Sequence, residues 1–226
     1  MSDVAEALAV LQFGDSFFPS GAVSFSGGLE GLSDGGVVNG ADAVRAFVTG
    51  QLRARWAEFD RAIVVAAHRA KMSLEDVVAI DEQVEMQTPC AELRSASRRM
   101  GEAMLSVFAR LGIGDAAAYR GLVKRGDAFG HLAAMQGCLW GCAGLSKRDA
   151  IALSAHTFTT GLLGAGIRLG CLSHIDAQQI LIEARQEAAR LAALPVPPTA
   201  ELSAYGIEAE VAVMRHVNNS LRVFAN

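Results

Sequence analysis

A helical spacing of apolar residues is the strongest constraint in this sequence. Over several turns, apolar side chains recur every three or four residues, the repeat that places them on one face of an α-helix. The clearest run comprises Val44, Phe47, Val48, Leu52, Trp56, Phe59 and Ile63. Alternating patterns typical of β-strands are nearly absent. The sequence therefore predicts an all-α fold.

Local signals for helix starts and ends divide the chain. Three segments carry Ser-x-x-Asp, in which the serine accepts from unpaired N–H groups and the acid favours the positive end of the helix. They begin at Ser73, Ser146 and Ser173, and Thr88-Pro89 predicts a fourth start. Glycine or proline predicts ends near 112–114, 125–126 and 194–198. The predicted helices span 3–13, 41–70, 74–88, 89–111, 115–124, 128–143, 147–170 and 174–193.

The chain of 226 residues is predicted to be one domain, because no low-complexity stretch or charge run divides it. The expected architecture is a single-domain irregular helical bundle of about eight to ten helices. Two segments lack the helical pattern: the Gly- and Ser-rich stretch from Gly14 to Gly40, and the C-terminal stretch after Pro198. Loops of this length are often functional. Lacking periodicity, the C-terminal stretch is expected to add little to the core.

Composition limits the partners. The net charge of -4 offers no general attraction for a nucleic-acid backbone, so no nucleic-acid partner is expected. Apolar residues make up 51% of the chain and charged residues 19%, and this surplus favours a buried protein–protein interface. The best membrane-spanning candidate, around 162–172, is interrupted by Arg168 and glycines, so no membrane is expected. The acidic N-terminal segment resembles no targeting peptide, which predicts a cytoplasmic protein.

The glycine-rich run over 161–170 suggests a nucleotide site but lacks its context. A dinucleotide fingerprint requires a strand, a tight turn and then a helix. No strand pattern precedes Gly164, Gly166 and Gly170, and their spacing is GxGxxxG. The favoured interpretation is close helix packing through small residues. No P-loop occurs in the sequence, so we expect the chain not to hydrolyse GTP itself.

Cysteines and histidines offer a second possible site. Cys138 and Cys142 lie four residues apart on a predicted helix, and His131 precedes Cys138 by seven, a spacing that can bring all three onto one face. The alternative, which we favour, is that they pack in a helix interface beside Trp140. The five histidines form no HExxH or HxH group. We expect no dedicated metal site, no cofactor and no disulfide framework.

Catalytic residues are not predicted either. Ser24 and Ser26 lie in the Gly/Ser loop, but GxSxG is absent and no His or Asp partner can be assigned. The chain is therefore expected not to be an enzyme. Glu30 follows the same loop, where it can either present an exposed charge to another molecule or serve as a first-turn acid favoured by the helix dipole.

The N-terminal segment resembles the signature of the UreF family of urease accessory proteins. That signature has Pro-x-Gly, an aromatic residue with Ser, and Gln-Gly-Leu-Glu. Its positions are occupied here by Pro19, Gly21, Ser24, Phe25, Ser26, Gly28, Leu29 and Glu30. Similar matches follow in order at 91–101, at 161–181 and in the terminal sequence VMRHVNNSLRVFAN. Gly27 departs from the pattern, because glutamine is usual there, and so do 173–174 and 217–219.

This resemblance implies an all-α homodimer that binds the accessory protein UreD, also called UreH, and recruits the GTPase UreG. The complex engages apo-urease, and nickel is inserted when GTP is hydrolysed. Residues 199–226 are then a partner-binding segment of the single domain 1–226. The implied partner-contact residues are Ser26, Glu30, Arg215, His216, Arg222 and Phe224.

Two other function classes stay open at the level of sequence. One is a helical enzyme or cofactor-binding protein, based on the glycine run, the cysteine pair and the histidines. The other is a generic helical dimerisation module.

Overall fold

The computed structural model describes residues 3–21, 25–199, 202, 206–216 and 223–224. Within these residues every regular element is helical and there is no strand, which confirms the all-α prediction. There are ten helices when the continuous stretch 41–70 is counted once. The elements are α1 (Asp3–Gly14), α2 (Leu29–Asp34), α3 (Ala41–Gln51), η2 (Leu52–Asp60), α4 (Arg61–Ala70), α5 (Leu74–Gln87), α6 (Ala91–Leu111), α7 (Ala116–Arg125), α8 (Leu132–Cys142), α9 (Lys147–Arg168), α10 (His174–Ala192) and α11 (Ile207–His216).

The local helix signals account for most boundaries. Ser73, Ser146 and Ser173 each cap a helix by accepting the backbone N–H three residues later. The prediction at Thr88 was wrong, because α6 begins two residues after Pro89 with Cys90 at the N-cap. The carbonyl groups of residues 88 and 89 instead accept hydrogen bonds from the Arg94 guanidinium, at 2.6 and 2.8 Å.

The predicted helix over 41–70 is continuous, but its central third, η2, is a π-helix. Wider π-helical turns are rare and often accompany functional sites. The sequence pattern did not predict this change of winding. The apolar stripe still points inward, since Leu52, Trp56 and Phe59 are all buried.

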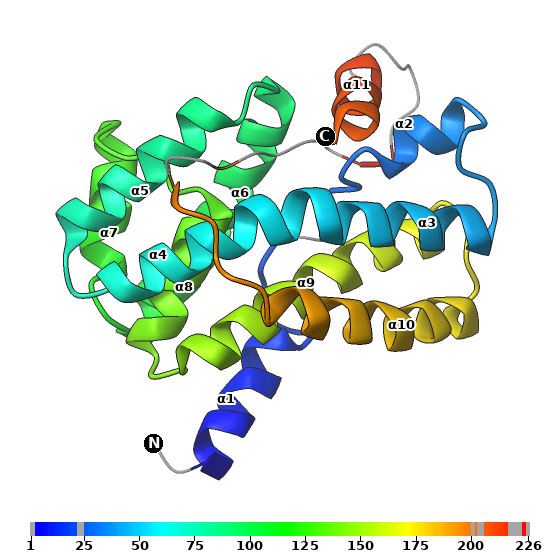
Figure 1. The fold of residues 1–226 in the computed structure, drawn as a ribbon. Coiled ribbons are helices and arrows are strands. Elements are labelled where there is room, and N and C mark those ends of the chain that lie inside the picture. The colour runs from blue at the N-terminus through cyan, green and yellow to red at the C-terminus, as the bar shows by residue number, and fades with distance from the viewer. Residues whose placement is uncertain (1–2, 22–24, 200–201, 203–205, 217–222, 225–226) are drawn as a thin grey trace.

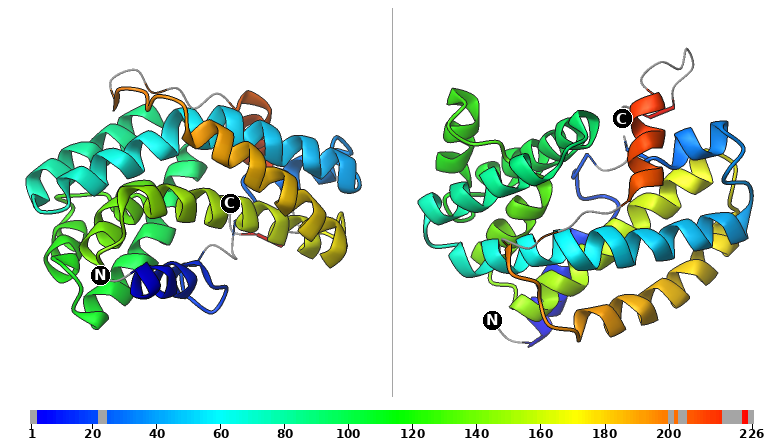
Figure 2. Two further views of the ribbon diagram at one scale, coloured as in Figure 1. Left: turned by 60° about the horizontal axis from the view of Figure 1, so that its bottom comes forward. Right: turned by 45° about the horizontal axis from the view of Figure 1, so that its top comes forward.

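Two long elements run the length of the molecule: the stretch α3–η2–α4, and α9 (Figures 1 and 2). Helices α5 and α8 pack on α4 at one end, with α6 and α7 beyond them, while α2 and α10 pack on α9 at the other end. The buried apolar side chains accordingly form two clusters, one around α8 and one between η2, α9 and α10.

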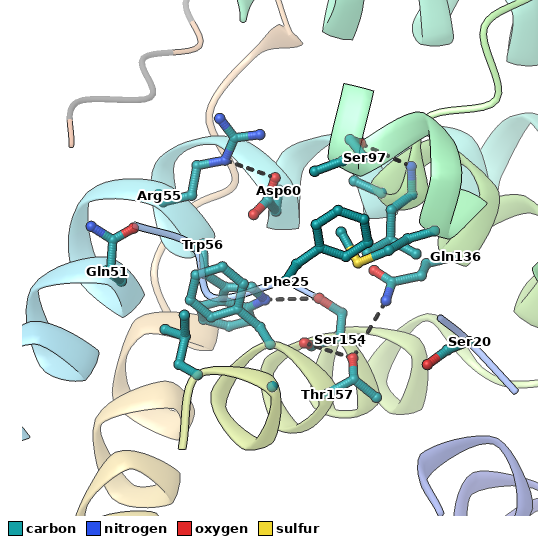
Figure 3. Close-up of a pocket in the computed structure, with 18 of the residues that line it drawn as sticks. Ser20, Phe25, Gln51, Arg55, Trp56, Asp60, Ser97, Gln136, Ser154 and Thr157 are labelled. Carbon is teal, nitrogen blue, oxygen red and sulfur yellow. Dashed lines mark hydrogen bonds and ion pairs between the residues drawn. The ribbon is translucent and has the colours of Figure 1, made fainter. Parts of the chain in front are cut away.

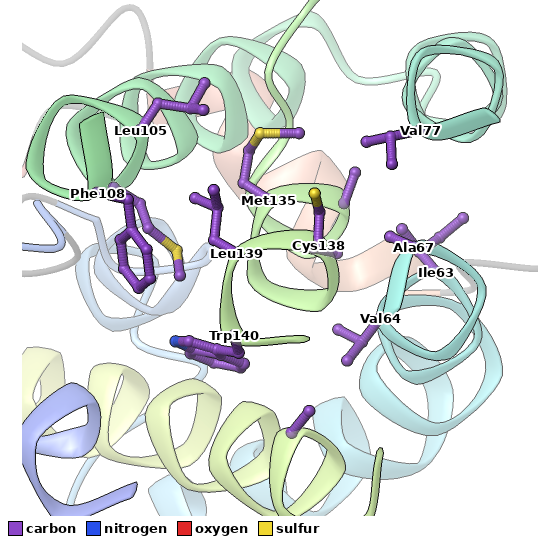
Figure 4. Packing of buried hydrophobic residues seen from close by; sticks show 14 of the residues in the cluster. Ile63, Val64, Ala67, Val77, Leu105, Phe108, Met135, Cys138, Leu139 and Trp140 are labelled. Atoms are coloured by element: carbon purple, nitrogen blue, oxygen red, sulfur yellow. The ribbon is translucent and has the colours of Figure 1, made fainter. Parts of the chain in front are cut away.

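The cluster around α8 contains side chains from several helices (Figure 4). Helix α8 is buried over nearly its whole length. Gly137 allows the close crossing with α4, because a Cβ at this position would lie 2.3 Å from the carbonyl oxygen of Val64. Phe13 and Phe108 of this cluster pack with their rings tilted by 39° and their centroids 5.2 Å apart.

Helix α9 explains the apolar composition around the glycine run. Of the helices that the structure describes, it is the one long and apolar enough to cross a membrane, and 56% of its most apolar window is buried inside the protein. It packs against α10, α4, α8, α1, α3, α2 and η2. A core helix of this kind has the same composition as a membrane span, so α9 does not indicate a membrane protein.

Two helices lie in segments that were predicted to be loops. Helix α2 follows the Gly/Ser loop, and α11 lies within the C-terminal segment, where the two helices pack together (Figure 2). The expectation that the C-terminal segment adds little to the core was wrong. Val213 of α11 has no exposed surface, and Phe224 is 3% exposed and belongs to the second cluster.

Candidate partner-binding site

The Gly/Ser loop leads into α2 through a buried serine. Ser26 has no exposed surface, and its hydroxyl accepts the backbone N–H of Glu30 at 3.4 Å. Gly28, the N-cap residue of α2, has φ of 95°. Because this left-handed conformation disfavours other residues, the loop requires glycine there. The serine and the glycine together direct the Glu30 side chain toward the C-terminal segment.

Glu30 is buried and bound to the chain's own terminus. It is 2% exposed and lies in the first turn of α2, so the alternative of an exposed charge was wrong and that of a first-turn acid holds. Its carboxylate accepts the backbone N–H of Val223 at 2.6 Å and that of Phe224 at 3.2 Å. Charged acceptors form the stronger class of hydrogen bonds. The carboxylate therefore fixes a segment that is 193 residues away in sequence.

Phe224 is the apolar half of this attachment. Its ring packs in the second core cluster, and the Cζ atom of Arg168 lies 4.6 Å from the ring centroid. A guanidinium over an aromatic face is attracted by the ring quadrupole. Burial lowers the pKa of Arg168 from its ordinary value, but the group stays charged because an arginine pKa is so high.

Helices α2 and α11 approach closely through glycines. A Cβ at Gly28 would lie 2.6 Å from the carbonyl oxygen of Ala209, and one at Gly31 would lie 2.6 Å from that of Ala212. Any larger residue would push α11 away. Gly27, where the family pattern has glutamine, has φ of 61°, and a Cβ there would lie 2.9 Å from Leu162. The local backbone therefore accounts for this departure.

A cavity of about 200 Å³ lies beneath this surface (Figure 3). Its wall combines side chains of η2, α6, α8 and α9, and the loop before α2 and the start of α11 form part of its lining. Arg55 donates to Asp60 at 3.1 Å on one side of it. Burial raises the pKa of the Asp60 carboxyl, and the charge of Arg55 opposes that shift.

The predicted site residues thus fall into two groups. The structure brings together Ser26, Glu30 and Phe224. Arg215 and His216 lie in α11, and their side chains are outside the described residues, as is Arg222. Their role as partner contacts stays a prediction.

Comparison with known proteins identifies the family of this chain. The UreF family model matches residues 38–185. The urease accessory protein UreF of Trichodesmium erythraeum is 33% identical over 189 residues, covering 80% of both chains. The chain belongs to the UreF family. Proteins of the same name from Yersinia enterocolitica and Yersinia pseudotuberculosis are 25% identical over 228 residues, covering 99% of this chain and all of each relative.

The UreF family match and the candidate site cover different parts of the chain. The matched residues begin at Val38 and end within α10, so they leave out both Glu30 and the C-terminal segment. The Yersinia UreF proteins extend over these parts. All of these relatives are described as accessory proteins.

One important group in this UreF chain was missed by sequence reasoning. Asp81 has no exposed surface and accepts the backbone N–H groups of residues 129, 130 and 131, at 2.7 to 2.9 Å. It also accepts the Tyr119 hydroxyl at 2.9 Å, and burial together with this carboxylate raises the pKa of Tyr119. These bonds hold an extended turn, which explains why α8 begins at Leu132 and not near 128. An acid within an amphipathic helix gave no signal of this role.

The cysteines do not join His131. Its ring nitrogens face Ser97 and Glu85, at 3.1 and 2.9 Å. The Cys142 thiol donates to the carbonyl oxygen of Lys71 at 3.5 Å, and its interaction with the neighbouring Cys138 thiol lowers the pKa of Cys142 to about 7. All four cysteines are free. Among the described residues, no three His, Cys, Asp or Glu side chains are grouped closely enough to hold a metal ion.

Proposed function

We propose that this chain is a urease accessory protein that binds a UreD/UreH-type partner and recruits a UreG-type GTPase. The resulting complex would engage apo-urease for GTP-dependent nickel insertion. The observation that carries the proposal is the bond between Glu30 and the backbone of Val223 and Phe224. It joins two segments that the family resemblance singles out separately.

The buried and the exposed residues have different roles in this proposal. Ser26 and Glu30 do not touch the partner but hold the C-terminal segment in place. The partner contacts α11 and the residues after it, where Met214 is 45% exposed and Val223 is 64% exposed. Exposed apolar groups beside basic side chains are typical of an interface that combines an apolar centre with a charged rim. Arg215, His216 and Arg222 would supply that rim.

Nickel and GTP belong to the partners in this proposal. The sequence has no P-loop, and the described part of the chain offers no cluster of three metal-binding side chains. The chain would act without catalysis of its own, in the cytoplasm, by positioning a GTPase and its metal cargo against apo-urease.

Homodimerisation is also proposed, through the exposed face of α1. Val4, Leu8 and Leu11 follow a helical repeat and are 70%, 60% and 67% exposed, and Phe17 nearby is 93% exposed. Such an apolar stripe on a surface helix is a typical contact face. Light scattering of Leu8→Glu should give half the mass of the wild-type particle. An unchanged mass would place the dimer contact elsewhere.

Urease activation in cells tests the central proposal. In cells that lack this gene, the full chain should restore urease activity, and a chain without residues 211–226 should restore little. The purified full chain should also capture both the UreD/UreH-type and the UreG-type proteins. Failure of the full chain to restore activity or to capture either partner would refute the proposal.

A further inference from the structure

The cavity in Figure 3 has the volume and the lining residues to receive one aromatic ring. Its wall is mostly apolar and includes Phe25, Trp56, Met100 and Leu162. At about 200 Å³ it exceeds the roughly 150 Å³ of a protein cavity that accepts benzene. Close-packed interiors contain few voids of this size, so an occupant would restore the missing contacts.

One side of the cavity is polar. Gln136 is 8% exposed, and its Nε2 donates to the hydroxyl of Thr157 at 3.4 Å. No described residue donates to its Oε1. The neighbouring Ser154 hydroxyl already accepts the Trp56 indole N–H at 2.8 Å. Because Gln136 lines the cavity, an amide oxygen that accepts from no described residue favours an occupant that carries an O–H or N–H group.

The place of the cavity indicates the source of that ring. Gly27, just before α2, and Gly206 and Ala209, at the start of α11, all line it. The proposed function places α11 at the partner contact, and α11 packs against α2, which follows the loop that contains Gly27. Aromatic side chains seated in pockets near the centre of an interface commonly supply most of the binding energy.

We propose that the cavity receives a tyrosine side chain of a protein partner, with its ring among the apolar residues and its hydroxyl donating to Gln136. This inference rests on the proposed function, since it places an anchor within the same binding face. It also gives the apolar cavity a role separate from nickel, which would need oxygen, nitrogen or sulfur ligands.

Binding of 4-fluorophenol to the purified full chain, followed by ¹⁹F NMR, is the direct test. Saturable binding is expected, and it should be about tenfold tighter than binding of fluorobenzene, which lacks the donor. Gln136→Leu should remove most of that difference while leaving the affinity for fluorobenzene nearly unchanged. Absence of saturable binding to the wild-type chain would overturn the proposal without reference to any variant.

Two glycines of α9 provide a matched pair for blocking the cavity. Gly161 lines the cavity, and a Cβ there would meet no atom within 4 Å, so Gly161→Leu can fill the space. Gly164 is on the same helix, where a Cβ would meet only the end of Arg168 at 3.7 Å, and it does not line the cavity. Gly161→Leu should weaken 4-fluorophenol binding at least tenfold, and Gly164→Leu should leave it unchanged. Equal effects would show that the ring binds elsewhere.

Binding of the UreD/UreH-type partner completes the test and separates it from the proposed function. Gly161→Leu should weaken partner binding about tenfold relative to Gly164→Leu. If the wild-type chain binds the partner and both variants bind it equally well, the anchor is overturned and the proposed function stands. If 4-fluorophenol binds but no partner does, both proposals fail and the cavity is a small-molecule site.

Discussion

Two buried carboxylates in this protein perform the same task with different consequences. Asp81 accepts three backbone N–H groups and a tyrosine hydroxyl, and it fixes a turn between α7 and α8. Glu30 accepts two backbone N–H groups near the C-terminus. Both acids hold a distant piece of backbone that forms no regular helix.

The difference lies in what surrounds each carboxylate. In the Asp81 turn, residues 130 and 131 are buried, so their N–H groups stay away from water when the acid is removed. The segment held by Glu30 lies nearer to water, because Val223 is 64% exposed although Phe224 is buried. Its N–H groups can become hydrated if the Phe224 ring withdraws from the second cluster, while the helices around that cluster stay in place. Identical hydrogen-bond chemistry therefore yields a structural clamp in one place and a releasable attachment in the other.

The largest effect is expected from Asp81→Ala. Removing the carboxylate leaves four donors without this acceptor, three of them buried. Each buried unsatisfied group costs about 1–3 kcal/mol, and partial relaxation should leave a loss of about 4 kcal/mol in the free energy of unfolding. Urea unfolding at pH 7 measures it. The exposed neighbour Glu82 is the control, and Glu82→Ala should change stability by less than about 0.5 kcal/mol. Similar changes in the free energy of unfolding for both variants would contradict the structural role of Asp81.

A glycine beside the same turn should give the next largest effect. A Cβ at Gly101 of α6 would lie 1.8 Å from the carbonyl oxygen of Gly130, a residue that Asp81 holds in place. Because the turn cannot retreat, Gly101→Ala should lower the free energy of unfolding by about 3 kcal/mol. Gly50 of α3 has no atom within 4 Å of its Cβ position, so Gly50→Ala should stabilise the protein by about 0.5–1 kcal/mol. Thermal unfolding of both variants decides whether the turn is as rigid as inferred.

Glu30→Ala should cost less, about 1–2 kcal/mol, because its two donors can turn to water once the terminus is released. This exceeds the change expected for an exposed acid. The released segment should become susceptible to proteolysis near Phe224 while the rest of the chain resists, and partner binding should weaken. Glu30→Gln keeps one acceptor oxygen, so its free energy of unfolding should lie between those of the wild-type chain and Glu30→Ala. Complete unfolding of Glu30→Ala would make the attachment as structural as that of Asp81.

A change of pH should affect the turn held by Asp81 and not the C-terminal segment held by Glu30. Burial lowers the pKa of His131, whose backbone N–H is held by Asp81, while Asp81 and Glu85 oppose that shift. The unfolded chain therefore binds a proton more readily below about pH 6.5, and stability is lost as pH falls through that value. A loss of about 1 kcal/mol between pH 7 and pH 5 is expected, and His131→Gln should flatten the difference. Protection of the C-terminal segment from proteolysis should not follow this loss of stability between pH 7 and pH 5.

The sequence predicted the parts of the fold that depend on near neighbours. The helix starts at Ser73, Ser146 and Ser173 need only a hydroxyl and an N–H three residues away. The stripe over 44–63 fixes which face of a helix turns inward, even where the winding becomes π-helical. Failures occurred where a distant group intervened: the Asp81 carboxylate shortened α8, and α2 gave α11 a surface to pack against.

The candidate site shows the same division. The sequence marked Glu30 and the C-terminal segment as separate features, because their motifs lie at opposite ends of the chain. Their contact, the burial of the carboxylate and the cavity beneath them depend on helices that meet only after the chain has folded. Short-range hydrogen bonding and apolar periodicity are written in neighbouring residues. Whether a carboxylate faces water or a backbone N–H from 193 residues away is decided by tertiary packing alone.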